Sequence, residues 1–284
     1  MTTSAMPQLL EFTSADGLRL LADVWGDAGA RPVLLQHGGG QTRHSWGSTA
    51  ADLAAAGWRA ISLDLRGHGD SHWDPRENYS LDAYASDTRA VLAQIDRPTV
   101  VVGASLGGLA ALRAHDTGAE KWFAGLILVD VTPTLDRSGA ERILQFMGAR
   151  LADGFADLDE VADSIAAYMP HRRRPENLEG LKKNLRLGVD GRYRWHWDPA
   201  FVTSGRRVSG TERDPLIEAS RNLRVPTLLV RGRMSDIVTM ETAREFLELV
   251  PHAEFVDVSG AGHMVAGDCN DIFSDAVLRF LGPA

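Results

Sequence analysis

The sequence predicts an α/β protein in which helices cover a mostly parallel β-sheet. Short apolar runs alternate with helical patterns from residue 9 onward, glycine-rich turns follow several of these runs, and the alternation stops over residues 133–222. We therefore expect a core formed by residues 1–132 and 223–284. Residues 133–222 are expected to form a helical lid inserted into that core.

The strands and helices of the core follow one another in a regular order. Segments 8–13 and 18–25 predict a hairpin because the turn dipeptide Asp16-Gly17 joins them. Further strands are predicted at residues 32–36, 59–64, 99–103, 125–131, 226–231 and 253–258. Helices are predicted before Gly57, after the N-cap candidate Ser80, and at residues 107–115, 240–249 and 271–281. Asp271 suits the first turn of the last helix, where a carboxylate complements the helix dipole.

The interval 133–222 has a different composition from the core. It lacks β-branched runs, is rich in Ala and Leu, and is nearly neutral, whereas the rest of the chain carries the acidic excess. Its group Trp195-His196-Trp197 is interpreted as lid core, with a pocket roof as the alternative. Its basic cluster at residues 171–194 is interpreted as a solvated face, with steering of an anionic substrate as the alternative.

Composition limits the classes of function. The 284 residues, 44% of them hydrophobic, suffice for a sizeable core and exclude a peptide hormone. A net charge of −8 argues against nucleic acid as a partner. Cys269 is the single cysteine and is interpreted as a packing residue, so no disulfide is expected. Without a secretory leader pattern or an apolar run of about 18 residues, we expect a cytoplasmic protein that does not enter a membrane.

The segment GASLGG at residues 103–108 is the most informative motif. It places Ser105 in a Gly-x-Ser-x-Gly pattern between a predicted strand and a predicted helix. A sharp turn there raises the serine above the sheet, and the small residues Gly103 and Gly107 prevent collisions. The following helix start supplies free N–H groups. We therefore predict that Ser105 is a nucleophile.

A serine nucleophile needs a base, and nine histidines are available. We choose His263 because it lies in the glycine-rich loop GAGHMV after the last predicted strand. His252 is interpreted as a surface residue. Structural roles are expected for the histidines near core strand ends, which are His37, His44, His68 and His72.

The third residue has to hold the histidine in one tautomer. We predict Asp236, which follows the strand at residues 226–231 through a short polar loop. Asp130, at the end of the preceding strand, is the alternative, and Asp268 is a third candidate. For the oxyanion we predict the backbone N–H groups of Gly39, in the HGGG segment 37–40, and of Leu106.

Together these motifs resemble the α/β-hydrolase fold superfamily, in particular its lid-bearing branch of serine esterases, non-haem haloperoxidase-like and epoxide-hydrolase-like proteins. The resemblance rests on HGGG at 37–40, DLRGHGDS at 64–71, GASLGG at 103–108, GRMSD at 232–236 and GAGH at 260–263. It implies an eight-stranded, mostly parallel sheet, a lid after the sixth strand, and neither a metal nor an organic cofactor. Ser105 departs from the aspartate nucleophile of epoxide hydrolases and dehalogenases, which argues against both chemistries.

The sequence thus predicts a cofactor-free serine hydrolase that cleaves a carboxylic ester or a related thioester or lactone. Its expected partner is a small acyl substrate. A homo-oligomer is also compatible with the sequence, which does not determine the oligomeric state. Perhydrolase or haloperoxidase-like activity with the same triad is one alternative. The other is a ligand-binding receptor with a hydrolase fold.

Overall fold

The computed structural model describes residues 6–169, 174, 176–205, 208, 213–263 and 270–284. Its main feature is an eight-stranded sheet with the order β1-β2-β4-β3-β5-β6-β9-β10. Strand β1 pairs antiparallel with β2, and β2 pairs antiparallel with β4, whereas the other pairs are parallel. The strands are β1 (Gln8–Thr13), β2 (Arg19–Trp25), β3 (Pro32–Gln36), β4 (Arg59–Leu63), β5 (Thr99–Ala104), β6 (Phe123–Val129), β9 (Thr227–Gly232) and β10 (Glu254–Val258). This sheet confirms the predicted fold class.

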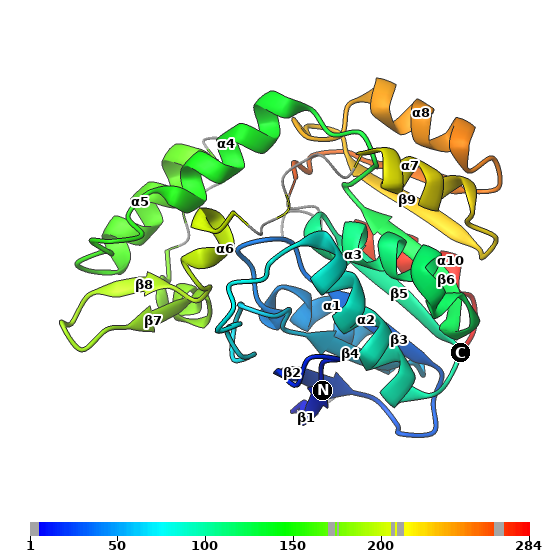
Figure 1. Ribbon diagram of the computed structural model, residues 1–284, viewed down its shortest axis with the longest axis horizontal. Helices are drawn as coiled ribbons and strands as arrows, with labels where there is room; N and C mark the ends of the chain where they lie inside the picture. Colours follow the sequence, from blue (N-terminus) through cyan, green and yellow to red (C-terminus); the bar gives the residue numbers. More distant parts are fainter. Residues whose placement is uncertain (1–5, 170–173, 175, 206–207, 209–212, 264–269) are drawn as a thin grey trace.

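Helices cover both faces of the sheet (Figure 1). The helices that accompany the sheet are α1 (Gly47–Ala55), α2 (Leu81–Ile95), α3 (Leu106–Ala114), α7 (Arg213–Arg221), α8 (Met240–Leu249) and α10 (Asn270–Leu281). Short turns η1 (Arg43–Trp46), η2 (His115–Ala119) and η3 (Glu120–Trp122) adjoin α1 and α3. As predicted, Ser80 caps α2, because its side chain accepts a hydrogen bond from the Ala83 N–H.

The alternation of side chains along the central strands gives the protein two apolar cores. Leu34 of β3 and Val101 of β5 belong to the larger core, which includes side chains of α2, α3, α7 and α8. Their neighbours in sequence, Val33 and Val100, point to the opposite face and join a second core with α1 and α10. Strands buried on both faces require continuous apolar runs, which explains why these strands were recognisable in the sequence.

Within its described residues, the segment between β6 and β9 adds no strand to the large sheet. It contains α4 (Arg137–Gly148), α5 (Leu158–Tyr168), η4 (Glu179–Asn184), β7 (Leu185–Leu187), β8 (Tyr193–Trp195) and α6 (Ala200–Thr203). These elements lie together on one side of the core in Figure 1, and we call them the insert. The antiparallel β7–β8 hairpin was not expected, because the sequence predicted helices alone. Helix α7, also within the predicted lid range, packs against α3 and α8 of the core instead.

Polar contacts attach the insert to the core at several places, among them Asp198 and Arg142. The Asp198 N–H donates to the Gly67 carbonyl over 2.8 Å, and the buried Tyr79 hydroxyl donates to the Asp198 carboxylate over 2.5 Å. At the other end, Arg142 of α4 forms an ion pair with Asp236, which follows β9. Among the residues with a described structure, no helix has the length and apolarity to span a membrane.

Candidate active site

Ser105 lies in a strained turn at the carboxyl end of β5. Its φ of 44° and ψ of −114° are unusual for a residue with a side chain, and α3 begins at the next position. The turn is tight: a Cβ added at Gly107 would lie 2.5 Å from the Gln36 carbonyl oxygen, and one at Gly103 would lie 2.5 Å from the Gly108 Cα atom. The strand, turn and helix therefore take the arrangement that the GASLGG motif predicts.

His263 follows β10 and forms a hydrogen bond with Asp130. The distance between His263 Nδ1 and Asp130 Oδ2 is 2.7 Å, and the two side chains are 16% and 1% exposed. Because an ionised carboxylate can only accept a hydrogen bond, this contact assigns the proton to Nδ1 and leaves Nε2 as the basic nitrogen. The imidazole is thus held in the tautomer that a general base requires.

The Asp130 carboxylate is fixed by further donors from the loop after β9. The Gly232 N–H donates to Oδ1 over 3.1 Å, and the Ser235 hydroxyl donates to Oδ2 over 2.5 Å. Ser235 Oγ in turn accepts the N–H groups of Ile237 and Val238, both at 3.1 Å. Ser235 is a site residue that the sequence motifs do not single out. Ser235 could have been recognised from its place in a loop at the carboxyl end of a parallel strand, because functional residues of such sheets lie there.

The prediction that Asp236 holds His263 is wrong in this structure. Asp236 forms an ion pair with Arg142 and is 42% exposed, and no hydrogen bond or ion pair joins it to His263 within the described residues. The reason lies in the loop, which directs the Ser235 side chain towards Asp130, while the next side chain meets α4. The partner of His263 is the alternative candidate, Asp130.

Backbone contacts bring Ser105 to the same sheet edge as the pair. The Ser105 N–H donates to the Val129 carbonyl over 3.1 Å, and the next residue after Val129 is Asp130. Within the part of the chain described, no hydrogen bond is formed between the Ser105 and His263 side chains, so their contact stays a prediction. Catalytic hydrogen bonds of this kind commonly tighten only when substrate binds.

The backbone N–H groups of the HGGG loop differ in their hydrogen-bond partners within the described residues. The Gly38 N–H donates to the Gln41 side chain over 2.9 Å, and the Gly40 N–H donates to His68 Nε2 over 3.1 Å. The Gly39 N–H between them makes no hydrogen bond in the described structure. The loop also lies close to the serine, because a Cβ added at Gly38 would be 3.4 Å from Ser105 Cβ. Leu106 opens α3, where an N–H group has no partner within the helix.

Two buried histidines hold this loop in place. His68 accepts the Gly40 N–H at Nε2, and its Nδ1 lies 3.0 Å from the Arg66 carbonyl. His37 Nδ1 lies 2.8 Å from the Gly38 carbonyl, and its Nε2 accepts the Leu65 N–H over 3.1 Å. Burial lowers the pKa of His37 to about 4 and the pKa of His68 to about 3, so both rings are neutral at pH 7. The structural roles expected for them are confirmed.

The DLRGHGDS segment builds the turn that carries His68. Asp64 accepts the N–H groups of Arg43, at 2.6 Å, and of Asp70, at 2.9 Å, and also pairs with the Arg43 guanidinium. The Ser71 hydroxyl closes the turn by donating to the Asp64 carbonyl over 2.7 Å. The acidic and polar residues of this motif therefore fix the backbone.

Apolar side chains of the insert lie over the glycine loop. A Cβ at Gly39 would be 3.1 Å from Phe201 Cζ, and one at Gly40 would be 2.9 Å from Met147 Cε and 3.4 Å from Trp197 Cζ3. Trp197 stacks on Trp195 with ring centroids 4.9 Å apart, and both rings are buried in the larger core. The interpretation of these tryptophans as packing residues is confirmed, and Trp197 also contacts the site.

Within the described residues, no group of three or more His, Cys, Asp or Glu side chains could hold a metal ion. Cys269, together with the alternative acid Asp268, lies outside the described residues.

This chain is similar to proteins of the alpha/beta hydrolase fold. The family model for the alpha/beta hydrolase fold matches residues 31–268. Esterase Rv0045c from Mycobacterium tuberculosis is 34% identical over 250 residues, covering 86% of this chain and 80% of the relative. The non-heme chloroperoxidase CPO-A1 from Kitasatospora aureofaciens is 27% identical, covering 95% of this chain and 98% of the relative. The crystal structure of an alpha/beta hydrolase from Novosphingobium aromaticivorans superposes with a TM-score of 0.83 at 27% identity, covering 99% of both chains.

Proposed function

Because the chain belongs to the α/β hydrolase fold family, we propose that it is a serine hydrolase that cleaves a carboxylic ester or a related small acyl compound. The observation that carries the proposal is the hydrogen bond between the buried Asp130 and the partly buried His263, at the sheet edge where the strained Ser105 turn lies. The esterase relative at 34% identity supports the same reaction class.

In the proposed mechanism, Ser105 Oγ attacks the carbonyl carbon of the ester while His263 Nε2 takes the hydroxyl proton. Asp130 stabilises the resulting imidazolium through Nδ1–H. The negative oxygen of the tetrahedral intermediate accepts hydrogen bonds from the Gly39 and Leu106 N–H groups. The imidazolium then gives its proton to the departing alkoxide, which leaves as an alcohol and forms the acyl-enzyme.

Water completes the reaction. His263 Nε2 removes a proton from water as the water oxygen attacks the acyl carbon, and the proton passes to Ser105 Oγ when the carboxylic acid leaves. Each bond broken is matched by one formed, so the cycle returns the serine and the neutral imidazole. Every proposed step uses side chains and backbone N–H groups of this chain, together with water.

The surroundings of Ser105 favour an apolar acyl or alcohol group. Phe201, Met147 and Trp197 of the insert lie over the glycine loop and present hydrocarbon and aromatic surface. Burying such surface contributes about 25 cal/mol per Å². We therefore propose that the insert acts as a lid that selects small apolar esters.

Hydrolysis of p-nitrophenyl esters of graded acyl length, together with lactones, tests the proposal. We expect turnover by the wild-type chain and a loss of at least about a thousandfold in kcat for Ser105→Ala. Equal rates for the two proteins would contradict the assignment of Ser105. Tight ester binding without turnover would instead favour the receptor alternative.

A second candidate is perhydrolysis, in which hydrogen peroxide attacks the acyl-enzyme in place of water. The similarity to a non-heme chloroperoxidase over 95% of this chain supports it. Rates of peracid formation from hydrogen peroxide and acetate measure this activity. A rate no higher than that of Ser105→Ala would exclude it.

A further inference from the structure

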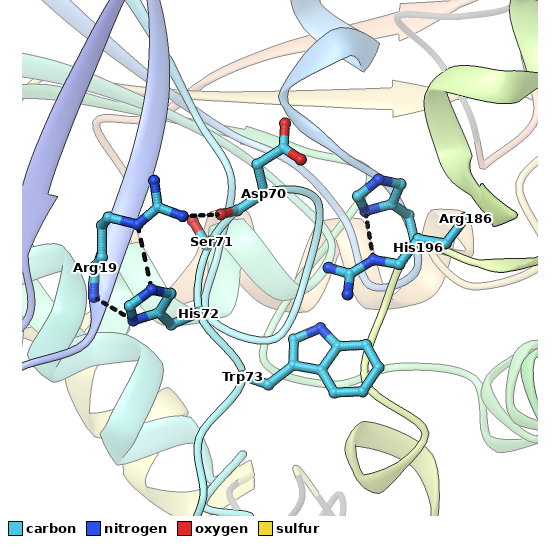
Figure 2. Close-up of a pocket in the computed structure, with 7 residues that line it drawn as sticks. All are labelled: Arg19, Asp70, Ser71, His72, Trp73, Arg186 and His196. Carbon is cyan, nitrogen blue, oxygen red and sulfur yellow. Dashed lines mark hydrogen bonds between the residues drawn. The ribbon is translucent and has the colours of Figure 1, made fainter. Parts of the chain in front are cut away.

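A surface pocket lies where the insert meets the core. It is an open pocket of about 500 Å³, a volume typical of small-molecule sites. Core residues 19 and 70–73 line one side, and Arg186 and His196 of the insert line the other (Figure 2). None of these side chains belongs to the proposed catalytic site.

Arg186 is the main feature of the pocket. Its guanidinium carbon lies 4.6 Å from the centre of the Trp73 ring. One nitrogen donates to the Gly69 carbonyl over 2.8 Å, and Nε donates to His196 Nδ1 over 3.2 Å. All of these partners are uncharged or aromatic, and no described carboxylate forms an ion pair with Arg186. Burial lowers the pKa of Arg186, and the negative charges of Asp70, Asp198 and Asp64 only partly oppose this shift.

The other charges around the pocket already have partners. Arg19 pairs with Glu11 at 3.0 Å, and Asp70 pairs with Arg43 at 2.8 Å. Burial lowers the pKa of His196, so this imidazole is neutral at pH 7. Among the described residues that line the pocket, one cationic side chain, that of Arg186, therefore has no ion-pair partner. It matches a monoanion, whereas a polyanion would meet repulsion from the half-exposed Asp70 carboxylate.

We propose that this pocket binds a small organic carboxylate. The planar Arg186 fork pairs with the carboxylate, and the hydrocarbon part of the ligand packs on Trp73, which is 38% exposed. This proposal concerns Arg186 alone, and the steering of an anionic substrate by the basic cluster stays a prediction. The exposed Lys182 and Arg194, which pair with Glu179 and Asp190, fit the solvated-face interpretation.

Titration calorimetry with sodium benzoate tests the site, with neutral benzamide as the isosteric control. We expect saturable benzoate binding to the wild-type chain and weak or no binding of benzamide. Arg186→Gln should raise the Kd for benzoate at least about tenfold, because the charge-assisted pair is lost. Arg194→Gln, on the same hairpin but paired with Asp190, is the matched control and should leave the Kd unchanged.

The same experiment can overturn the proposal. Absence of saturable benzoate binding would do so, as would an equal Kd in Arg186→Gln, which would indicate binding elsewhere, including at Ser105. Inorganic phosphate binding as tightly as benzoate would contradict the carboxylate assignment. If Arg186→Gln fails to fold by circular dichroism, Arg186→Lys and Trp73→Leu replace it. Each should weaken benzoate binding, and an unchanged Kd in both would refute the site.

Discussion

The Asp130 carboxylate accepts three hydrogen bonds although its side chain is almost completely buried. Its donors are the Gly232 N–H, the Ser235 hydroxyl and His263 Nδ1. A buried carboxylate needs such donors to offset the loss of hydration. The same contacts fix its direction, so the histidine it holds is fixed as well.

Residue types and their order in the chain did not determine which aspartate forms the hydrogen bond with His263. Asp130 and Asp236 both follow strands of the parallel sheet, and both precede His263 in the chain. The choice depends on which way each side chain points after its strand, and this is set by Ser235 and by the position of α4. Ser105 and Gly39, in contrast, were predictable because their motifs constrain the backbone itself.

Exchanging the two aspartates for asparagine separates the candidates. Asp130→Asn should lower kcat/KM for ester hydrolysis by roughly 10³- to 10⁴-fold, because the amide favours the wrong imidazole tautomer. Asp236→Asn loses one exposed ion pair and should stay within about threefold of the wild-type rate. Steady-state kinetics on one p-nitrophenyl ester measures both. The reverse order of effects would restore Asp236 as the acid.

Ser235 provides a finer test of the same contact. Ser235→Ala removes one donor to Asp130 and should lower kcat roughly tenfold with little change in KM, because substrate does not touch this residue. Ser138→Ala, at an exposed position on α4, is the control and should keep the wild-type kcat. An unchanged kcat in Ser235→Ala would show that the other two hydrogen bonds suffice to hold Asp130.

At the scale of elements, the core strands were predictable and the insert was only partly so. Strands β3, β5 and β6 contain apolar runs because both of their faces are buried. The β7–β8 hairpin has three residues in each strand, too few for a periodic pattern. Helix α7 carries a polar composition like that of the lid, although it packs on α3 and α8, so composition alone does not distinguish this helix from the lid.

The glycine loop and the insert meet at Gly39, which leads to a prediction. Gly39→Ala should lower kcat/KM roughly tenfold, because the new methyl group presses on Phe201 and shifts the N–H donor. Gly180→Ala, where an added Cβ meets nothing within 4 Å, is the matched control. The double variant with Phe201→Leu should recover part of the loss. Full activity of Gly39→Ala would argue against a donor role for this loop.

At the scale of the whole molecule, the proposed site lies where the insert packs on the sheet core, and side chains of both parts share the larger apolar core. The sheet and its two apolar cores position Ser105, Asp130 and the loop that carries His263, and the insert supplies the apolar cover. Neutral, buried histidines join the loops of the core beneath that cover. The stability of the protein should therefore depend on keeping them unprotonated.

Acid should weaken the fold through these histidines. The pKa of His68 is about 3 in the folded chain against 6.5 for an ordinary histidine, so between these pH values the unfolded chain binds the extra proton. Stability is therefore lost as the pH falls through this window, by about 2 kcal/mol for His68 between pH 7 and pH 5. In urea unfolding, His68→Gln should reduce the pH dependence of the free energy of unfolding by that amount. Other groups, such as Asp87, titrate in both proteins and do not contribute to the difference. An identical pH dependence would contradict a neutral His68.

Labelling by a fluorophosphonate shows whether Ser105 is an activated nucleophile, because only a serine activated by a neighbouring base reacts rapidly. We predict that mass spectrometry of the digested wild-type protein finds the phosphonyl group on the peptide that contains Ser105. Asp130→Asn should label far more slowly, and Asp236→Asn at the wild-type rate. Labelling at another residue, or no labelling of a folded wild-type chain, would show that Ser105 is not the activated nucleophile.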